Sequence, residues 1–547
     1  MCLAHTVLIN ICASGPSWKC RSPGDFLQLF VITFPLMKLP WHFTSPSGLK
    51  IELVASFAGT GWSGVVQLAC IPAYIKMMGI EAYGLIGFYL VLQAVLQVLD
   101  LGLSPTMNRE MARYSVRPEK ATEARDLVRT LEIGYWLIGL LIGAGIVTAS
   151  PWLAIHWIKA SAIPVRSVMQ AVMLMGVLAV FQWPVSFYQG GLMGLRRQVL
   201  LNALKVVFAT LTNVGGVLIL WSISPTIQAL LLWQVATNAV LVTILAIFLW
   251  KSLPGSDRRA QFDLVVTRNV WRFAAGMTGI AVVSLVLTQA DKLLVSKLFS
   301  LKTFGYYALA WSVANGPLIL AGCVFSVVFP RMSALVAAGD NDGISHCYHR
   351  GSQLMAVLIL PLAAVLCLFS FEILRLWTGN SETAASTAPI LSVLIVGSAV
   401  NALLYLPYIL QLAFGWTKFT FLAALISIST LVPLMFPMSK MFGPIGTASI
   451  WAILNVSNML IAVPIMHRGL LPGETRNYFS DIGRPLLIVI ATVIIGRFMF
   501  TKIDSPLLTF AVVAGLWLAS STGAILVAPL IRLAIRQQLC KLSLTYA

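Results

Sequence analysis

Long apolar runs alternate with short polar or charged breaks along almost the whole chain. A helix needs about 20 mostly apolar residues to cross the hydrocarbon core of a bilayer, and most runs reach that length. The pattern predicts about fourteen transmembrane helices, and therefore an all-α polytopic membrane protein with short connecting loops. The predicted spans are 51–75, 83–104, 131–155, 167–189, 199–221, 227–250, 270–298, 304–329, 353–377, 388–413, 417–438, 444–466, 485–500 and 507–530.

Composition agrees with this interpretation. Of the 547 residues, 59% are apolar and 10% are charged, whereas soluble domains have about 45–50% apolar and about 25% charged residues. These values exclude a soluble globular or disordered chain. Residues 1–48 do not follow the pattern, because the apolar stretch 26–36 is too short to span a bilayer. We interpret them as an N-terminal extension, and we hypothesise that natural translation begins at Met37.

Lysine and arginine predict the orientation of the helices. With both chain ends in the cytoplasm, the inside loops and the tail carry 21 basic residues and the outside loops carry 7. The largest basic cluster, over residues 109–129, then follows the second predicted helix on the inside. Most of the formal net charge of +18 therefore reflects membrane topology, and no nucleic acid is expected as a partner.

Two stretches resemble each other without a gap, namely residues 75–84 and 296–305. The aligned pairs include Lys76 with Lys297, Tyr83 with Phe304, and Gly84 with Gly305. Six predicted helices separate equivalent positions, so both copies have the same orientation, as in parallel-repeat transporters. The predicted organisation is an extension over 1–48, a first half over 49–250 (helices 1–6), a cytoplasmic linker over 251–269, a second half over 270–466 (helices 7–12), and two C-terminal helices with a cytoplasmic tail over 467–547.

Several motifs occur in an order and spacing that resemble a known family. They are Ala82–Phe88, Leu99–Ser104, Asn108–Arg113, Gln289–Lys297, Phe304–Tyr307 and Phe329–Ser333. Over residues 50–480 the chain resembles the Wzx-type O-antigen flippases, which are polysaccharide transporters of the multidrug/oligosaccharidyl-lipid/polysaccharide superfamily. The last two helices match weakly.

The resemblance implies a fold and a function. Two pseudo-symmetric six-helix lobes would form a V around a central cavity, with two extra C-terminal helices. By alternating access, the protein would move an undecaprenyl-diphosphate-linked oligosaccharide across the bacterial cytoplasmic (inner) membrane. The resemblance also allows for a coupling ion, either a proton or sodium, and for a polysaccharide polymerase or export complex as a partner. It implies no cofactor.

Ionisable and polar residues inside the spans are the first candidates for a substrate cavity, because they are costly in a bilayer and usually face protein or water. The candidates are Asp291, Lys292, Arg272, Gln289, Gln67 and Asn315. We expect Asp291 to carry a coupling cation or to orient a nearby base, and Lys292 or Arg272 to attract phosphate. A structural inter-helix pair at Asp291 is the alternative. Neighbours on a helix point about 100° apart, so we expect Asp291 and Lys292 not to pair with each other.

Other polar residues have structural explanations. Asp100 lies at the cytoplasmic end of the second predicted helix, where it could accept hydrogen bonds or pair with Arg109. We expect Lys205 to reach the cytoplasmic interface and Arg497 to reach the outer head groups. The stretch 346–349 has histidines at both ends, but no second ligand pair completes a metal site, so we expect an interfacial loop without metal.

Competing functions remain open. A cation-coupled exporter of small amphipathic compounds, of the multidrug efflux type, can share the two-lobed fold, and a lipid II-type flippase is a closer relative. A membrane glycosyltransferase, polymerase or ligase would need a sizeable outer loop with catalytic groups. The predicted outer loops are short and contain only three acids, Glu81, Glu382 and Asp504, so we expect no enzyme. The chain has no Walker-type phosphate loop, which disfavours direct ATP drive.

Overall fold

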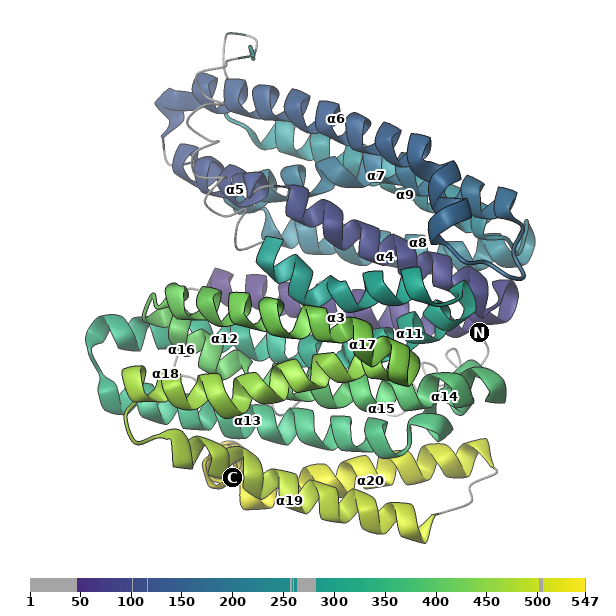
Figure 1. Ribbon diagram of the computed structural model, residues 1–547. Coiled ribbons are helices and arrows are strands. Elements are labelled where there is room, and N and C mark those ends of the chain that lie inside the picture. The colour runs from purple at the N-terminus through teal and green to yellow at the C-terminus, as the bar shows by residue number, and fades with distance from the viewer. Residues whose placement is uncertain are drawn as a thin grey trace. The chain divides into compact units, whose positions relative to one another are not determined.

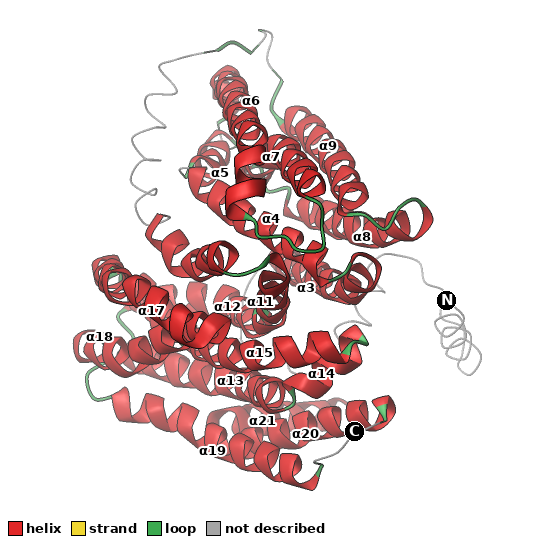
Figure 2. Cartoon of the chain, turned by 45° about the vertical axis from the view of Figure 1, so that its right-hand side comes forward, coloured by secondary structure: helices red, strands yellow, loops and turns green. Residues whose placement is uncertain are grey.

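The computed structural model describes residues 47–546 except for 101, 116, 256–257, 259, 263–281 and 501–504. Within these residues every regular element is a helix, as the apolar pattern predicted (Figure 2). The chain divides into two compact units, and the larger one is Ser45–Ala528. The smaller unit is described only in α21 (Pro529–Tyr546). The helices from α3 to α20 all belong to the larger unit.

The first half contains seven α-helices, a short 3-10 turn and a π-helix, within the residues described above (Figure 1). They are α3 (Ser47–Met78), α4 (Ile80–Leu99), α5 (Leu103–Tyr114), the 3-10 turn Pro118–Lys120, α6 (Ala121–Trp152), the π-helix Leu153–Trp157, α7 (Val165–Gly194), α8 (Gln198–Ser222) and α9 (Ile227–Ser252). Helix α7 packs against both α6 and α9. The core that these helices form with α5 is apolar and aromatic, with Met107, Tyr135, Phe187 and Tyr188 fully buried.

The second half begins, in the described part of the chain, with the helix over residues 282–298. It continues with α11 (Leu301–Ala314), α12 (Gly316–Ala338), α13 (Asn341–Leu368), α14 (Ser370–Thr378), α15 (Ser381–Leu403), α16 (Tyr405–Ala413), α17 (Thr417–Ser457), the π-helix Asn458–Ala462 and α18 (Val463–Leu470). Two C-terminal helices follow, α19 (Thr475–Met499) and α20 (Pro506–Val527).

Eleven helical stretches among the described residues are long and apolar enough to cross a membrane. This finding supports a polytopic helical protein but leaves the predicted number of about fourteen spans unconfirmed. Some predicted spans are broken: 304–329 contains a break at Asn315, and 353–377 contains one at Phe369. Others merge, because Thr417–Leu470 is helical throughout except for a kink at Gly443 (φ 63°, ψ −147°), inside the predicted loop 439–443.

The two copies of the sequence repeat pack directly against each other. The first copy leads into α4 and the second into α11, and these helices make an extensive contact. A methyl group on Gly84 would lie 2.6 Å from the carbonyl oxygen of Leu301, and one on Gly305 would meet the carbonyl oxygen of Ile80. Ile80 and Leu301 are themselves equivalent in the repeat. The contact is therefore reciprocal, as a two-fold relation between the copies requires.

Candidate functional site

An ion pair lies within the second half, on the helix over residues 282–298. The Nζ atom of Lys292 is 3.2 Å from Oδ1 of Asp291, and both side chains are nearly inaccessible to solvent, at 7% and 4% exposure. The expectation that these neighbours would not pair was wrong. The 100° between their Cβ directions fixes only where the side chains start, and the four methylene groups of lysine let the ammonium turn back toward the carboxylate.

Helix α11 completes the surroundings of this pair. The hydroxyl of Tyr307 donates to Oδ2 of Asp291 at 2.7 Å. The ammonium of Lys292 donates to the carbonyl of Thr288 at 2.6 Å and lies 3.6 Å from the ring centroid of Trp311. Three favourable neighbours therefore surround a group with three N–H bonds. In this arrangement Lys292 has no donor left for an anion, and both oxygens of Asp291 already accept hydrogen bonds.

Polar contacts continue from Trp311 through the second half. Its ring packs edge-on against Trp451 of α17 with centroids 5.5 Å apart. The indole of Trp451 donates to Ser398 of α15 at 3.3 Å, and one turn further along α17 the Asn455 carbonyl accepts from the Asn401 amide at 2.6 Å. These contacts link α11, α15 and α17, so a change at the ion pair has a physical route into three helices.

The first half also holds carboxylates next to tyrosines. Asp100 accepts from the Tyr135 hydroxyl at 2.5 Å, from the Ser104 backbone N–H at 3.0 Å and from the Ser186 hydroxyl at 3.4 Å. Arg109, the partner considered for Asp100, lies against Glu110 at 2.7 Å. Asp100 thus connects the end of α4 with α5, α6 and α7.

Glu132 of α6 is a second such carboxylate, with 8% of the residue exposed. It accepts from the Tyr188 hydroxyl at 2.7 Å and from the Trp250 indole at 3.2 Å, and it pairs with Arg129 at 3.1 Å. Glu132 was not predicted from the sequence, where it stands at the start of the apolar run of α6, three residues after Arg129 and close to other charged residues.

Of the remaining cavity candidates, Gln289 lies on the same helix as the ion pair. It lies one turn before Lys292 and is half-buried. Asn315 marks the junction of α11 and α12, where its carbonyl accepts from the Leu318 N–H at 3.1 Å. Gln67 is exposed on α3, and Arg272 lies outside the described residues. The structure therefore groups Asp291, Lys292 and Gln289, and adds Tyr307 and Trp311, which the sequence analysis missed.

Arg497 of α19 forms an ion pair with Glu372 of α14, a carboxylate with 14% exposure. One further expectation is corrected. The stretch 346–349 is not a loop, because it lies within α13. Lys205 donates to Thr60 of α3 at 3.1 Å.

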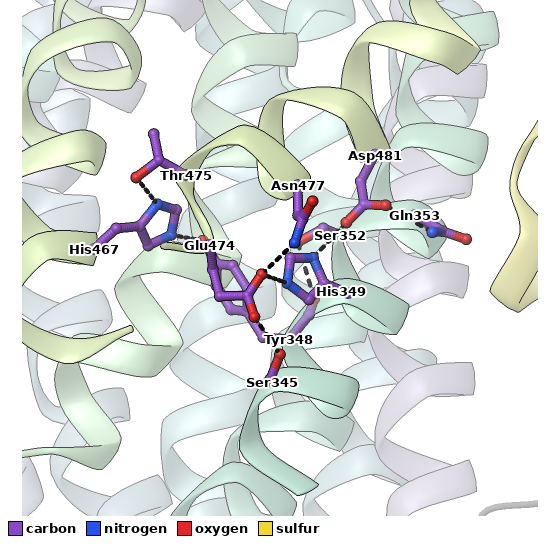
Figure 3. A network of polar contacts seen from close by, with 10 residues as sticks. All are labelled: Ser345, Tyr348, His349, Ser352, Gln353, His467, Glu474, Thr475, Asn477 and Asp481. Atoms are coloured by element: carbon purple, nitrogen blue, oxygen red, sulfur yellow. Dashed lines mark hydrogen bonds and ion pairs between the residues drawn. The ribbon is translucent and has the colours of Figure 1, made fainter. Parts of the chain in front are cut away.

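His349 belongs to a polar network that joins α13 to the start of α19 (Figure 3). Its Nδ1 lies 2.6 Å from Asp481 and its Nε2 lies 3.0 Å from Glu474. Only an imidazolium can donate from both ring nitrogens, so this geometry favours the charged form. Among the described residues no group of three or more His, Cys, Asp or Glu side chains is arranged to hold a metal ion.

Glu474 lies in the turn before α19, outside the apolar spans. The pKa of its carboxyl group is below the ordinary value, mainly because the Asn477 amide donates to it at 2.6 Å. Burial opposes this shift, whereas the hydroxyl of Ser345 and the ring of His349 add to it. The network is therefore built to keep Glu474 charged.

Comparisons with known proteins give consistent results. The sequence model of a family described as polysaccharide biosynthesis proteins matches residues 76–386, more than half of the chain. A putative O-antigen transporter from Shigella flexneri is 21% identical over 392 residues, which cover 70% of this chain and 89% of that protein.

Solved structures share the fold. A lipid II flippase, MurJ, in an inward closed conformation superposes with a TM-score of 0.67 at 14% identity, covering 86% of this chain and 98% of that one. An inward-facing multidrug resistance MATE family transporter of the MOP superfamily has a TM-score of 0.61 at 13% identity, covering 76% and 96%. At these identities the likeness concerns the fold alone.

Proposed function

Because the chain belongs to the family of polysaccharide biosynthesis proteins, we propose that it is a flippase for undecaprenyl-diphosphate-linked oligosaccharide, such as an O-antigen or exopolysaccharide repeat unit. The transport would cross the bacterial inner membrane by alternating access, with both chain ends in the cytoplasm. The observation that carries the proposal is the family match over residues 76–386, which includes the second copy of the internal repeat and all but the first residue of the first copy. The similarity to a putative O-antigen transporter favours this class of substrate.

The physical task agrees with a chain of this kind. The diphosphate and sugars need a polar path, whereas the polyprenyl tail stays in lipid, so a helical membrane protein with a few internal charges suits the substrate. The described helices offer such charges in the second half, at Asp291 and Lys292. No ATP-binding motif is present in the sequence, so an ion gradient or consumption of the product outside would supply the drive.

We assign Asp291 the role of orienting Lys292. Its two oxygens accept from Lys292 and Tyr307, so a free sodium ion would have to displace a tethered ammonium. For Lys292 to attract phosphate, its ammonium has to leave the Thr288 carbonyl or the Trp311 ring, and this requirement keeps anion binding weak enough for release. Gln289, one turn away, could then bond a sugar hydroxyl.

Deletion of the gene tests the proposal. We expect loss of long-chain surface glycan, with single repeat units accumulating on undecaprenyl diphosphate in the inner leaflet. Plasmid-borne wild type should restore the glycan and Asp291→Asn should not, whereas Glu382→Gln, which alters an exposed pair with Lys302, serves as the matched control and should restore it. Unchanged glycan in the deletion strain would contradict the proposal.

A second candidate is a cation-coupled exporter of small amphipathic compounds. The specific observation in its favour is the fold shared with a multidrug resistance MATE family transporter. The same deletion strain separates the two functions. Increased sensitivity to cationic drugs together with normal glycan would support the exporter and reject the flippase.

A further inference from the structure

A short segment between α6 and α7 connects the two halves. Residues 156–162, called the latch below, belong to the first half in sequence but contact the beginning of the second half. The carbonyl of Lys159 accepts the Leu301 N–H at 2.8 Å, and its ammonium donates to the Leu298 carbonyl at 3.0 Å. One residue of the latch therefore holds both sides of the turn that precedes α11.

Neighbouring residues strengthen this contact. The ammonium of Lys297 donates to the His156 carbonyl at 3.0 Å and lies 4.7 Å from the ring centroid of Trp157. The indole of Trp157 donates to the Ser296 hydroxyl at 3.1 Å. Side chains from both halves thus supply donors, which makes the contact specific and not merely apolar.

The local backbone explains why the latch can accept these bonds. Residues 153–157 form a π-helix, in which the Ile158 N–H reaches back to the Leu153 carbonyl at 2.9 Å. The helix then ends, so the last carbonyl groups have no further N–H within it. The His156 carbonyl is one of these, and Lys297 supplies its donor. Single-turn π-helices occur frequently at functional sites.

Glu81 fixes the other end of the latch. Its carboxylate, on the first turn of α4, accepts from the backbone N–H groups of Ser161 at 2.5 Å and Ala162 at 2.9 Å. The residue is only 6% exposed. A buried carboxylate with two backbone donors is a strong, charge-assisted anchor. The end of the latch at Ser161 and Ala162 is therefore bonded to α4, while Lys159 is bonded to the start of α11.

The internal repeat supplies a comparison. Lys297 is equivalent to Lys76, which is exposed on the last turn of α3. Within the described contacts, the Lys297 position joins the halves, whereas Lys76 makes no contact of this kind. Beside the latch, α4 and α11 cross at Gly84 and Gly305, and the hydroxyls of Tyr83 and Ser312 lie 3.0 Å apart.

We infer that the latch is a releasable gate contact, which holds the outer ends of α4 and α11 together and has to open once in each transport cycle. This inference rests on the proposed flippase function and on the proposed orientation, which places residues 156–166 outside. Its parts suit repeated opening, because water can replace each hydrogen bond and the half-buried Lys297 can follow either half. The contact gates the outer exit of the substrate.

Accessibility measurements test the inference. In the full chain with its native cysteines replaced, Ser312→Cys reports on the α4–α11 crossing through its reaction with a membrane-impermeant thiol reagent added outside. We expect Lys297→Gln to increase the labelling rate about tenfold, which corresponds to loss of one charged hydrogen bond. Lys76→Gln is the matched control and should leave the rate unchanged. An unchanged rate in a folded Lys297→Gln protein would overturn the inference.

A second, smaller substitution tests the inference in case Lys297→Gln fails to fold. Ser296→Ala removes the acceptor of Trp157, together with a bond from the same hydroxyl to the Leu293 carbonyl within its own helix, and should raise labelling two- to fivefold at normal membrane abundance. In the opposite direction, Trp157→Cys and Ser296→Cys, joined by a short reducible bifunctional thiol reagent, should stop glycan export until reduction. Continued export with the crosslink in place would refute the gate.

Unchanged glycan after gene deletion would instead refute the proposed function, and the labelling data would still test the latch.

Discussion

The Asp291–Lys292 pair allows a quantitative test of how this chain handles charge within its apolar interior. Replacement of Lys292 by methionine keeps most of the side-chain volume but leaves a buried carboxylate with only the Tyr307 hydroxyl as donor. Breaking a buried pair by removing one partner costs about 3–5 kcal/mol, because the remaining charge is uncompensated. We therefore expect Lys292→Met to lower both thermal stability and membrane abundance.

Removal of both charges should cost less than the single change. In Asp291→Asn/Lys292→Met the asparagine can still accept from Tyr307, and neither position of the pair carries a charge. Replacing a whole buried pair is often nearly neutral. The double-mutant cycle should thus give a coupling energy of about 3 kcal/mol, with the double variant more stable than Lys292→Met.

The exposed pair of Lys302 and Glu382 is the matched control. Its side chains are 46% and 70% exposed, and exposed pairs contribute about 0–1 kcal/mol. The assay is thermal unfolding of the purified protein in detergent, combined with the amount of protein in membranes and the surface glycan. Equal coupling at the two pairs would refute the reasoning. A double variant that is stable but does not restore glycan would separate the transport role of the pair from its structural role.

Three further outcomes are expected in the same unfolding assay. Gly305→Ala should cost about 1–3 kcal/mol by forcing α11 away from α4, whereas Gly145→Ala, at an open position, should be neutral. The free energy of unfolding should fall as the pH drops below about 4.5, because the pKa of Glu474 is lower in the folded chain than in the unfolded one, so the unfolded chain binds the proton more readily. Glu474→Gln should make this fall smaller. Arg497→Gln should cost about 1–3 kcal/mol by leaving the Glu372 carboxylate without its guanidinium, and Glu372→Gln/Arg497→Gln should recover part of this loss.

The sequence could predict the fold because the bilayer imposes a simple rule on length and polarity. Runs of about 20 apolar residues must become helices, since no other segment satisfies its own backbone in lipid. The repeat at residues 75–84 and 296–305 was also readable, and Gly84 and Gly305 prove to lie at a mutual contact. Helix boundaries were less predictable, because an apolar run such as 353–377 continues through a break without a change in composition.

The partners of these side chains could not be predicted from the sequence, for two different physical reasons. For Asp291 and Lys292 the Cβ directions predict no contact, whereas the length of the lysine side chain allows one. For His349 the partners Glu474 and Asp481 are more than a hundred residues away, on an element whose packing no periodicity specifies. The aromatic neighbours of the ion pair were missed because a tyrosine in an apolar run has no signal that distinguishes a donor from a packing residue.

The latch and the buried pair are mechanically connected, and this connection bears on how the proposed transport could work. Lys292 and Lys297 lie on one helix, about 7–8 Å apart along its axis. The other side of the pair, Tyr307 and Trp311, lies on α11, whose first N–H is held by Lys159. Release of the latch would therefore free both helices that surround the ammonium at the same time. Because Lys292 has no spare donor while its neighbours stay in place, we expect it to engage an anion only when these helices shift relative to each other, which would couple substrate binding to opening of the outer gate.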